Sequence, residues 1–183
     1  LDGAWVNFIE TVQNFKVKLF GPFNITYPLK MYHSKHGPVL KDDNKAYALR
    51  FVGMNDVNHS TAWLKMNKSK NIDEWLDALR MEQLASLNLV YADKDDNIFF
   101  VHNAKSPVRD PNYNWKQVVP GNKSDLIWRD FHPFESVPQI LNPSSGYIFS
   151  TNQNPFFVTA KEDNLSLSNF NPTMGFQTRT TNR

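Results

Sequence analysis

Side-chain amides follow an apolar segment near residue 150 of this 183-residue chain. Residues 146–151 are predicted to form a strand, because an apolar run follows the turn formers Asn142-Pro-Ser-Ser. This strand would present Asn152, whose amide N–H can donate a hydrogen bond to the oxyanion that develops on a carbonyl under attack. Removing one such donor typically lowers the rate by about 10² to 10³. The alternative interpretation is a purely structural strand bounded by two turns.

The sequence contains no motif for the nucleophile that such a donor would serve. It has no Cys, no Gly-x-Ser-x-Gly pattern and no Ser-x-x-Lys pattern. Its first residue, Leu1, has no hydroxyl or thiol that its own α-amino group could activate. We therefore expect the chain to be part of an enzyme.

Histidines and an acid-rich turn do not predict a metal site. His33 and His36 lie three residues apart, but in a segment with the pattern of strand and turn rather than helix. Residues 93–97 mimic a calcium loop, yet the loop lacks the Gly at position 6 and the Glu at position 12 of an EF-hand. We expect His36 to order a His-Gly-Pro turn and residues 93–97 to form a solvated hairpin turn.

The elements that must position Asn152 begin with a run of strands. Apolar residues alternate or nearly so between Gly, Pro and Asp-Asp-Asn turn signals, which predicts an antiparallel sheet within residues 11–52. The expected strands are residues 15–19, 24–27, 31–39 (through a Gly-Pro turn) and 46–52.

The periodicity then becomes helical. Residues 62–66 are a short helix candidate, and Asn71 with Glu74 three residues later forms an Asn variant of a capping box before a helical pattern that continues to Leu84. Residues 87–92 and 97–102 are predicted to pair as a hairpin, with both arms apolar enough to be central strands. Strand clusters interrupted by a helical stretch give an α+β fold class.

The remaining segments have little periodicity. Residues 103–140 are rich in Pro, Asn and Trp, which favours an ordered long loop that packs aromatic side chains such as Trp115 and Trp128. From Pro155 onward the chain is polar and is expected to be irregular. Trp75, Tyr91 and Phe149 could line an acyl pocket, but each lies in a periodic element and is more simply explained as core.

Composition excludes several classes of function. The chain is 40% hydrophobic and 14% aromatic, which is typical of a globular protein. Its 20 basic and 18 acidic residues are scattered and give a net charge of only +2, so a nucleic-acid partner is not expected. No apolar run approaches the roughly 20 residues that a membrane-spanning helix needs.

An ordered series of short motifs resembles the β-chain of the penicillin acylase family, amidohydrolases of the N-terminal-nucleophile class. The match runs nearly end to end, and its order and spacing carry it rather than any one motif. The tail, residues 156–183, is more similar to the acyl-homoserine-lactone acylase and aculeacin acylase branch than to the penicillin G branch. The motifs are Gly3-x-Trp5, His36-Gly-Pro-Val39, Tyr91-Ala-Asp93, Asp96-Asn-Ile98, Pro107-Val-Arg109, Val119-Pro-Gly121, Trp128, Pro138 and Asn142-Pro143 to Pro155.

The resemblance implies a fold and a set of site residues. The fold would be part of the four-layer αββα sandwich of N-terminal-nucleophile hydrolases, with residues 1–183 as a segment of the β-chain that lacks its nucleophile-bearing N-terminal part. Asn152 matches the family's oxyanion-hole Asn, with Asn154 as the nearest alternative. Arg183 matches an Arg that orders the active site without touching the substrate, and Arg179 is its rival.

The implied function is hydrolysis of the amide of an N-acylated substrate, either penicillin-like or an acyl-homoserine lactone. No cofactor is required, and the calcium ligands of some family members are not recognisable here. The expected partners are the remaining acylase segments, namely the α-chain and the N-terminal part of the β-chain, and the small N-acyl substrate. The segment alone should be inactive, with exposed sheet faces and edges. A periplasmic or secreted location is implied by the resemblance only.

Two other classes remain open. One is a non-catalytic member of the same fold that binds an acylated or peptide ligand. The other is an extracellular β-rich binding module, which the aromatic content and the five Asn-x-Ser/Thr sequons would support. These sequons are at Asn24, Asn58, Asn67, Asn122 and Asn164.

Overall fold

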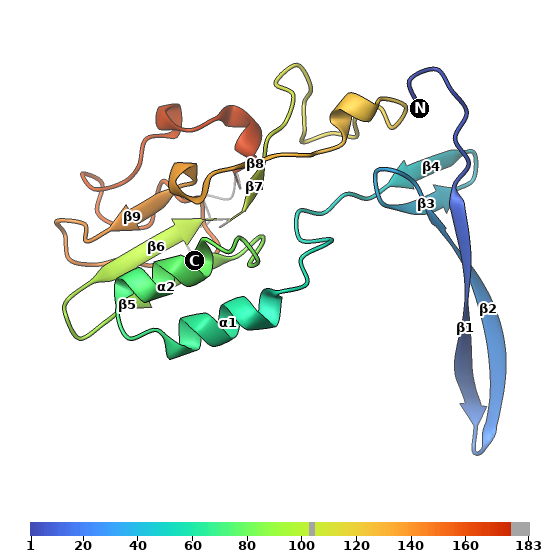
Figure 1. Cartoon of the computed structure of the whole chain (residues 1–183), viewed down its shortest axis with the longest axis horizontal. Helices are drawn as coiled ribbons and strands as arrows, with labels where there is room; N and C mark the ends of the chain where they lie inside the picture. Colours follow the sequence, from blue (N-terminus) through green and yellow to red (C-terminus); the bar gives the residue numbers. More distant parts are fainter. Residues whose placement is uncertain (103–104, 177–183) are drawn as a thin grey trace. The chain divides into compact units, whose positions relative to one another are not determined.

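The computed structural model of the chain describes residues 1–102 and 105–176, which divide into two compact units (Figure 1). The first unit comprises residues 1–51 and 119–127, and the second comprises residues 52–118 and the chain from residue 128 onward. Helices occur together with antiparallel strands, which confirms the predicted α+β class. Neither α-helix of the described part has the length and hydropathy of a membrane span.

The first unit contains an antiparallel sheet with its strands in sequence order, β1-β2-β3-β4. β1 and β2 pair along a long hairpin that turns at Gly21, whose φ is +51°. β3 pairs with β2 only at Tyr32 and His33, so most of the hairpin is a two-stranded ribbon. The predicted sheet is confirmed, although the hairpin is longer than expected and β4 ends before residue 52. The strands are β1 (Ile9–Phe20), β2 (Phe23–His33), β3 (Pro38–Asp42) and β4 (Lys45–Ala48).

Two short helices open the second unit, α1 (His59–Lys68) and α2 (Ile72–Leu79). The side chain of Asn71 accepts a hydrogen bond from the N–H of Glu74 at 2.9 Å, as the capping pattern predicts. The carboxylate of Glu74 reaches back to the N–H of Lys70 at 2.9 Å, one residue before the cap. α2 ends at Leu79, whereas the helical pattern was expected to continue to Leu84. Leu84 is nevertheless buried.

The sheet of the second unit has the order β5-β6-β9, with β5 (Asn88–Ala92), β6 (Ile98–His102) and β9 (Gln139–Leu141) all antiparallel. The predicted hairpin is therefore confirmed. Only β6 is central, where Phe99, Phe100 and Val101 are all buried, whereas β5 lies at the edge of the described sheet. The expectation that both arms are central was wrong because β9, from far along the chain, adds to β6 and not to β5.

Each face of this sheet has its own core. Phe99 and Val101 pack with buried residues of α1 and α2 in the larger cluster. Both helices are drawn in green in Figure 1. Phe100 and Ile140 point to the other face and pack with Val158. The segment from residue 143 to 165 therefore covers the sheet face opposite the helices.

The predicted loop over residues 103–140 contains short elements in its described part, residues 105–140. β7 (Ser106–Pro107) pairs with β8 (Phe131–His132), and 3-10 turns form at η1 (Ser124–Leu126) and η2 (Phe134–Ser136). Trp115 and Trp128 pack against each other with ring centroids 6.1 Å apart, which agrees with the prediction that this segment packs aromatic side chains. After Pro155 the described chain is irregular apart from the 3-10 turns η3 (Leu167–Asn169) and η4 (Pro172–Met174).

The predicted strand over residues 146–151 does not form. The segment runs beside residues 157–159, but only one backbone bond joins the two within the described chain, from the Phe149 N–H to the Val158 carbonyl at 2.9 Å. A side chain provides another link, because the hydroxyl of Thr159 donates to the Tyr147 carbonyl at 2.8 Å. The Val158 N–H donates instead to the Oδ1 atom of Asn164, at 2.9 Å. The apolar pattern of residues 146–151 predicts a strand, but the local sequence does not reveal that distant side chains will bond to the backbone in place of a neighbouring strand.

Candidate functional site

Asn152 occupies a turn in the segment that covers the sheet face opposite the helices. Its φ of 62° is in the left-handed region, which Asn tolerates better than most residues because its short polar side chain can bond locally. The side chain is exposed, and no residue within the described ranges bonds to its amide group. The Nδ2 group therefore keeps both of its N–H donors for an external acceptor.

Gln153 holds the turn that presents Asn152. Its side chain is 5% exposed, and its Nε2 group donates to the carbonyl oxygens of Phe149 at 3.0 Å and Phe157 at 3.1 Å. Its Oε1 atom accepts from the N–H and the hydroxyl of Thr151. One buried amide thus ties together the chain before and after Asn152. Local sequence gives no signal for this role beyond the amide-rich run itself.

Asn154, the nearest alternative to Asn152, serves its own turn. Its Oδ1 atom accepts from the N–H of Phe156 at 3.0 Å, an Asx turn that fixes the side-chain orientation. Pro155 follows directly and is buried. The amide of Asn152 is exposed and neither of its ends is bonded within the described chain, whereas that of Asn154 is only partly exposed and is oriented by its Oδ1 bond.

A second group of polar contacts joins residues 144–147 to residues 159–163, at the two ends of the loop that contains Asn152. Asp163 accepts from the hydroxyl of Ser144 at 2.8 Å and from the N–H of Ser145 at 2.7 Å. These bonds, led by that of Ser144, lower the pKa of the Asp163 carboxyl. The hydroxyl of Thr159 bonds to that of Ser145 at 2.8 Å and donates to the Tyr147 carbonyl at 2.8 Å. The two ends of the loop are therefore linked, with Asn152 between them.

Of the three aromatic residues expected to be core, only Phe149 departs from that expectation. Trp75 and Tyr91 are core residues as predicted, with ring centroids 5.0 Å apart. Phe149 is not: its side chain is 46% exposed and stacks on the exposed Tyr147 with centroids 6.4 Å apart. The expectation failed because the strand that would have buried Phe149 does not form. An exposed aromatic pair thus lies three to five residues before Asn152.

The two candidate arginines, Arg183 and Arg179, lie outside the described residues. Arg109, by contrast, is half-buried. Its guanidinium lies 4.7 Å from the Trp128 ring centroid and 5.6 Å from that of Trp115, and it donates to the Thr173 carbonyl at 3.2 Å. Burial lowers the pKa of Arg109.

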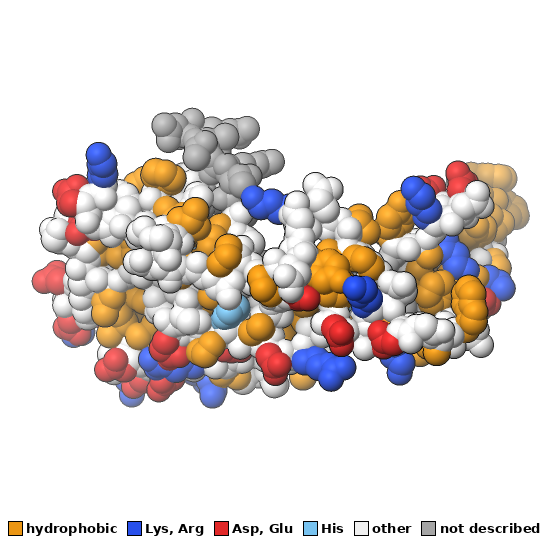
Figure 2. Space-filling model, turned by 90° about the horizontal axis from the view of Figure 1, so that it is seen from above, with side chains coloured by type: hydrophobic (Ala, Val, Ile, Leu, Met, Phe, Trp, Pro, Cys, Tyr) orange, Lys and Arg blue, Asp and Glu red, His pale blue; other side chains and the backbone are white. Residues whose placement is uncertain are grey.

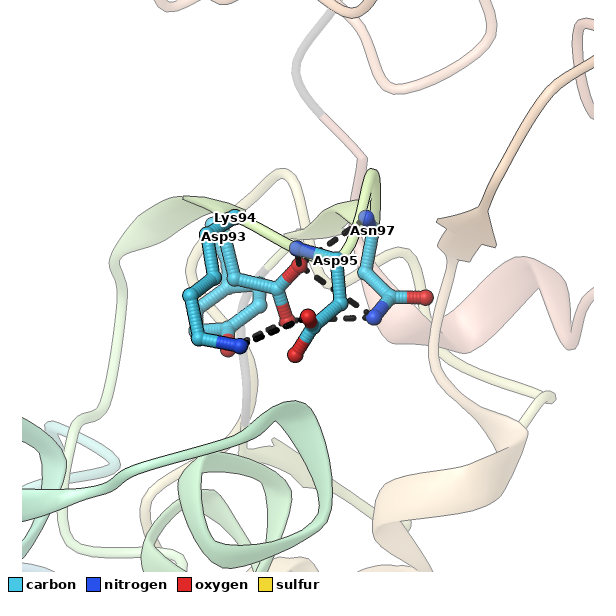
Figure 3. Close-up of polar contacts among 5 residues, drawn as sticks. Asp93, Lys94, Asp95 and Asn97 are labelled. Carbon is cyan, nitrogen blue, oxygen red and sulfur yellow. Dashed lines mark hydrogen bonds and ion pairs between the residues drawn. The ribbon is translucent and has the colours of Figure 1, made fainter.

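The acid-rich turn at residues 93–97 is the hairpin turn between β5 and β6 (Figure 3). The Oδ1 atom of Asp93 accepts from the N–H groups of Asp95 at 2.9 Å and Asn97 at 3.0 Å, and Lys94 pairs with Asp95 at 2.7 Å. The carboxylate of Asp93 therefore serves the backbone of its own turn. Within residues 1–102 and 105–176, no three His or acidic side chains are grouped as metal ligands would be.

His36 lies in the turn between β2 and β3, as expected. Ser34 and Gly37 exchange backbone hydrogen bonds across this turn, and the N–H of His36 donates to the Ser34 hydroxyl at 3.1 Å. Burial lowers the pKa of His36, and a hydrogen bond with the backbone of Gly121 opposes this shift only in part. His36 also lines a hollow of about 330 Å³ formed only by residues of the first unit, among them Phe8 and Val39. Asn152 belongs to the other unit.

His102 is a buried polar residue that the sequence analysis did not single out. It ends β6, is fully buried, and its Nδ1 atom lies 2.6 Å from the Oδ1 atom of Asn88. Burial lowers its pKa to about 4. The ring is therefore neutral near pH 7 and is inaccessible to a substrate, so its role is structural.

Comparisons with known proteins find similar sequences and a similar fold. Residues 1–181 match the family model described as penicillin amidase. The chain is 32% identical over 158 residues to penicillin G acylase of Escherichia coli, a match that covers 84% of this chain and 18% of that protein. It is 30% identical over 123 residues to penicillin acylase 2 proenzyme of Pseudomonas sp. (strain SE83), covering 65% and 16%, respectively.

The fold is similar to that of the thermostable penicillin G acylase from Alcaligenes faecalis, with a TM-score of 0.71 and 25% identity, over 91% of this chain and 30% of that chain. This likeness agrees with the predicted N-terminal-nucleophile hydrolase fold. The chain thus spans less than a fifth of the length of both curated relatives.

Proposed function

This chain belongs to the penicillin amidase family, and we propose on that premise that it supplies the oxyanion-binding Asn152 of an enzyme that hydrolyses the amide of an N-acylated substrate. The observation that carries the proposal is the exposed amide of Asn152, which the described residues leave uncommitted on a turn clamped by Gln153. A donor held in place before the reaction stabilises developing charge without reorganisation.

In the proposed reaction, the hydroxyl of an N-terminal Ser, outside residues 1–183, attacks the amide carbonyl. Its own α-amino group takes the proton. The carbonyl oxygen becomes negative, and the Nδ2 group of Asn152 donates to it together with a backbone N–H from the missing part. The amine leaves, and water then releases the acid from the acyl-enzyme. No step uses a cofactor, and residues 1–183 alone are inactive.

The substrate class is an N-acyl compound, either penicillin-like or an acyl-homoserine lactone. The exposed Tyr147 and Phe149 support an apolar acyl group, because acyl pockets are lined mainly by apolar side chains. Arg183, or its rival Arg179, would order the site without touching the substrate. The partners of this segment are the α-chain and the N-terminal part of the β-chain, in an enzyme that is exported to the periplasm or secreted.

The test is the Asn152→Ala variant in the full-length protein, assayed with a penicillin and with an N-acyl-homoserine lactone. We expect kcat to fall by about two orders of magnitude with the melting temperature unchanged. Asn154→Ala is the matched comparison, because it removes the neighbouring amide and should affect kcat far less. Wild-type turnover by Asn152→Ala would refute the assignment.

A further inference from the structure

The hairpin of β1 and β2 has one face made of apolar side chains. Phe15 pairs with Tyr27 and Val17 with Ile25, and these four side chains, together with Leu29, which is opposite Gln13, define what we call the apolar face. Their side chains are between 41% and 58% exposed, and none is charged. Hydrophobic side chains are visible at the surface of the first unit, which contains the hairpin, at the right of Figure 2.

The opposite face of the hairpin is mainly polar. Lys16 pairs with Thr26 and Lys18 with Asn24, and Lys30 forms an ion pair with Glu10 at 2.8 Å. Strand alternation places these side chains and the apolar ones on different faces. A strand pair with one charged and one apolar face is typical of a sheet that meets water on one side only.

The ribbon also lacks a third strand over most of its length, because β3 reaches only Tyr32 and His33. A two-stranded hairpin is at best marginally stable in water, and packing of a hydrophobic face provides the missing stability. An exposed apolar patch of this kind marks an interaction surface. The hairpin is therefore built to be covered on its apolar face.

We propose that the apolar face is the docking surface for the part of the same polypeptide that lies outside residues 1–183. This inference rests on the proposal that the chain is a segment of a longer acylase. The match to the Escherichia coli protein covers only 18% of that protein, so a polypeptide of family length holds ample chain to cover the hairpin. Because the face has no charge, its occupant is an uncharged, apolar strand or helix face of that polypeptide.

Cross-linking in the purified full-length protein identifies the occupant without destabilising the fold. A photo-reactive phenylalanine analogue replaces Tyr27 on the apolar face, and in a control it replaces Thr26 on the polar face. The protein is a mixture of ¹⁴N- and ¹⁵N-labelled molecules. We expect the probe at residue 27 to give cross-links within one molecule, to residues outside 1–183, and the probe at residue 26 to give few or none.

Two results would overturn the proposal. Mixed-isotope cross-links would identify a second copy as the occupant, and cross-links confined to residues 1–183, or none at all, would leave the face uncovered by the missing part. Hydrolysis is measured separately on the wild-type full-length protein. Loss of the proposed reaction there leaves the cross-links unchanged, so the two failures are distinguishable.

Limited proteolysis gives an independent measurement. In the full-length protein, Tyr27→Lys places a charge in the docked face and should raise cleavage within residues 9–33 by about tenfold or more, since proteolysis follows the population of the open form. Asn14→Lys places the same charge on the polar face, opposite Pro28, and should leave the cleavage rate within about twofold of wild type. Equal cleavage of the two variants would contradict the inference.

Discussion

The side-chain amide of Gln153 donates to the carbonyl oxygen of Phe149 at 3.0 Å, across the turn that presents Asn152. The same Nε2 group donates to Phe157 at 3.1 Å, so one buried side chain fixes the backbone on both sides of the exposed amide. An oxyanion donor works only when it is held at the place where charge develops. Gln153 is therefore the positioning residue for Asn152 in the proposed site.

Gln153→Ala in the full-length enzyme should lower kcat by between about 10- and 100-fold, because a displacement of about 1 Å of a catalytic group can cost that much. KM should change little, since the oxyanion contact is made mainly in the transition state. Steady-state kinetics measure both constants.

Gln139→Ala is the control for this variant. Gln139 also donates from a partly buried amide to a backbone carbonyl, that of Phe134 at 2.8 Å, but it lies on β9. The kcat of the Gln139→Ala variant should remain at the wild-type value. Equal losses of kcat in the two variants would show that Gln153 contributes only general stability.

The buried, neutral ring of His102 should make the folded protein less stable in mild acid. Burial lowers its pKa to about 4 in the folded protein, against about 6.5 in the unfolded chain. Between these values the unfolded state binds a proton that the folded state does not, so stability falls as the pH drops from 6.5 to 4 and does not change further below. The contribution of this group is about 3 kcal/mol over that window.

Melting temperatures of the full-length protein at a series of pH values measure this effect. In His102→Gln, which can still donate to Asn88, the decrease between pH 6.5 and 4 should be smaller than in wild type. Identical profiles for wild type and His102→Gln would contradict the prediction.

Gly175 should not tolerate a side chain. Its φ is +76°, and a Cβ atom there would lie 2.9 Å from the Nη1 atom of Arg109. Gly175→Ala should therefore destabilise the protein by at least about 1 kcal/mol, from backbone strain and from the close contact. Thermal unfolding measures the change.

Gly121→Ala serves as the comparison, because a Cβ atom at Gly121 meets nothing within 4 Å and its φ is outside the strained region. This variant should unfold within about 0.5 kcal/mol of wild type. A Gly175→Ala protein as stable as Gly121→Ala would contradict both the left-handed backbone at residue 175 and the close contact with Arg109.

Two helix caps of the same residue type differ in their bonding. Asn71 caps α2 with a bond from the Glu74 N–H, whereas Asn58, before α1, makes no side-chain cap bond. Asn71→Ala should cost about 1 kcal/mol of stability, and Asn58→Ala should cost clearly less. Chemical denaturation of both variants measures the difference, and equal losses would contradict the assigned caps.

Features that depend on residues a few positions apart could be predicted from the sequence. The cap at Asn71 and the turn at residues 93–97 were both recognised, because their donors and acceptors lie within four residues. The prediction of a strand over residues 146–151 was wrong. The hydroxyl of Thr159 bonds to the Tyr147 carbonyl, and Asn164 bonds to the Val158 N–H, so side chains from farther along the chain take up backbone groups of this region. The burial of Phe149 failed for the same reason.

The sequence by itself determined the family, the α+β class and the choice of Asn152 as the residue to test, because motif order and side-chain chemistry are written along the chain. Only the tertiary structure decided that the Asn152 amide is exposed on a turn, that Gln153 clamps this turn, and that one face of the β1 and β2 hairpin remains uncovered. The physical reason is that burial and hydrogen-bond partners depend on segments distant in sequence, such as β9 beside β6. Local patterns contain no record of which segments will meet.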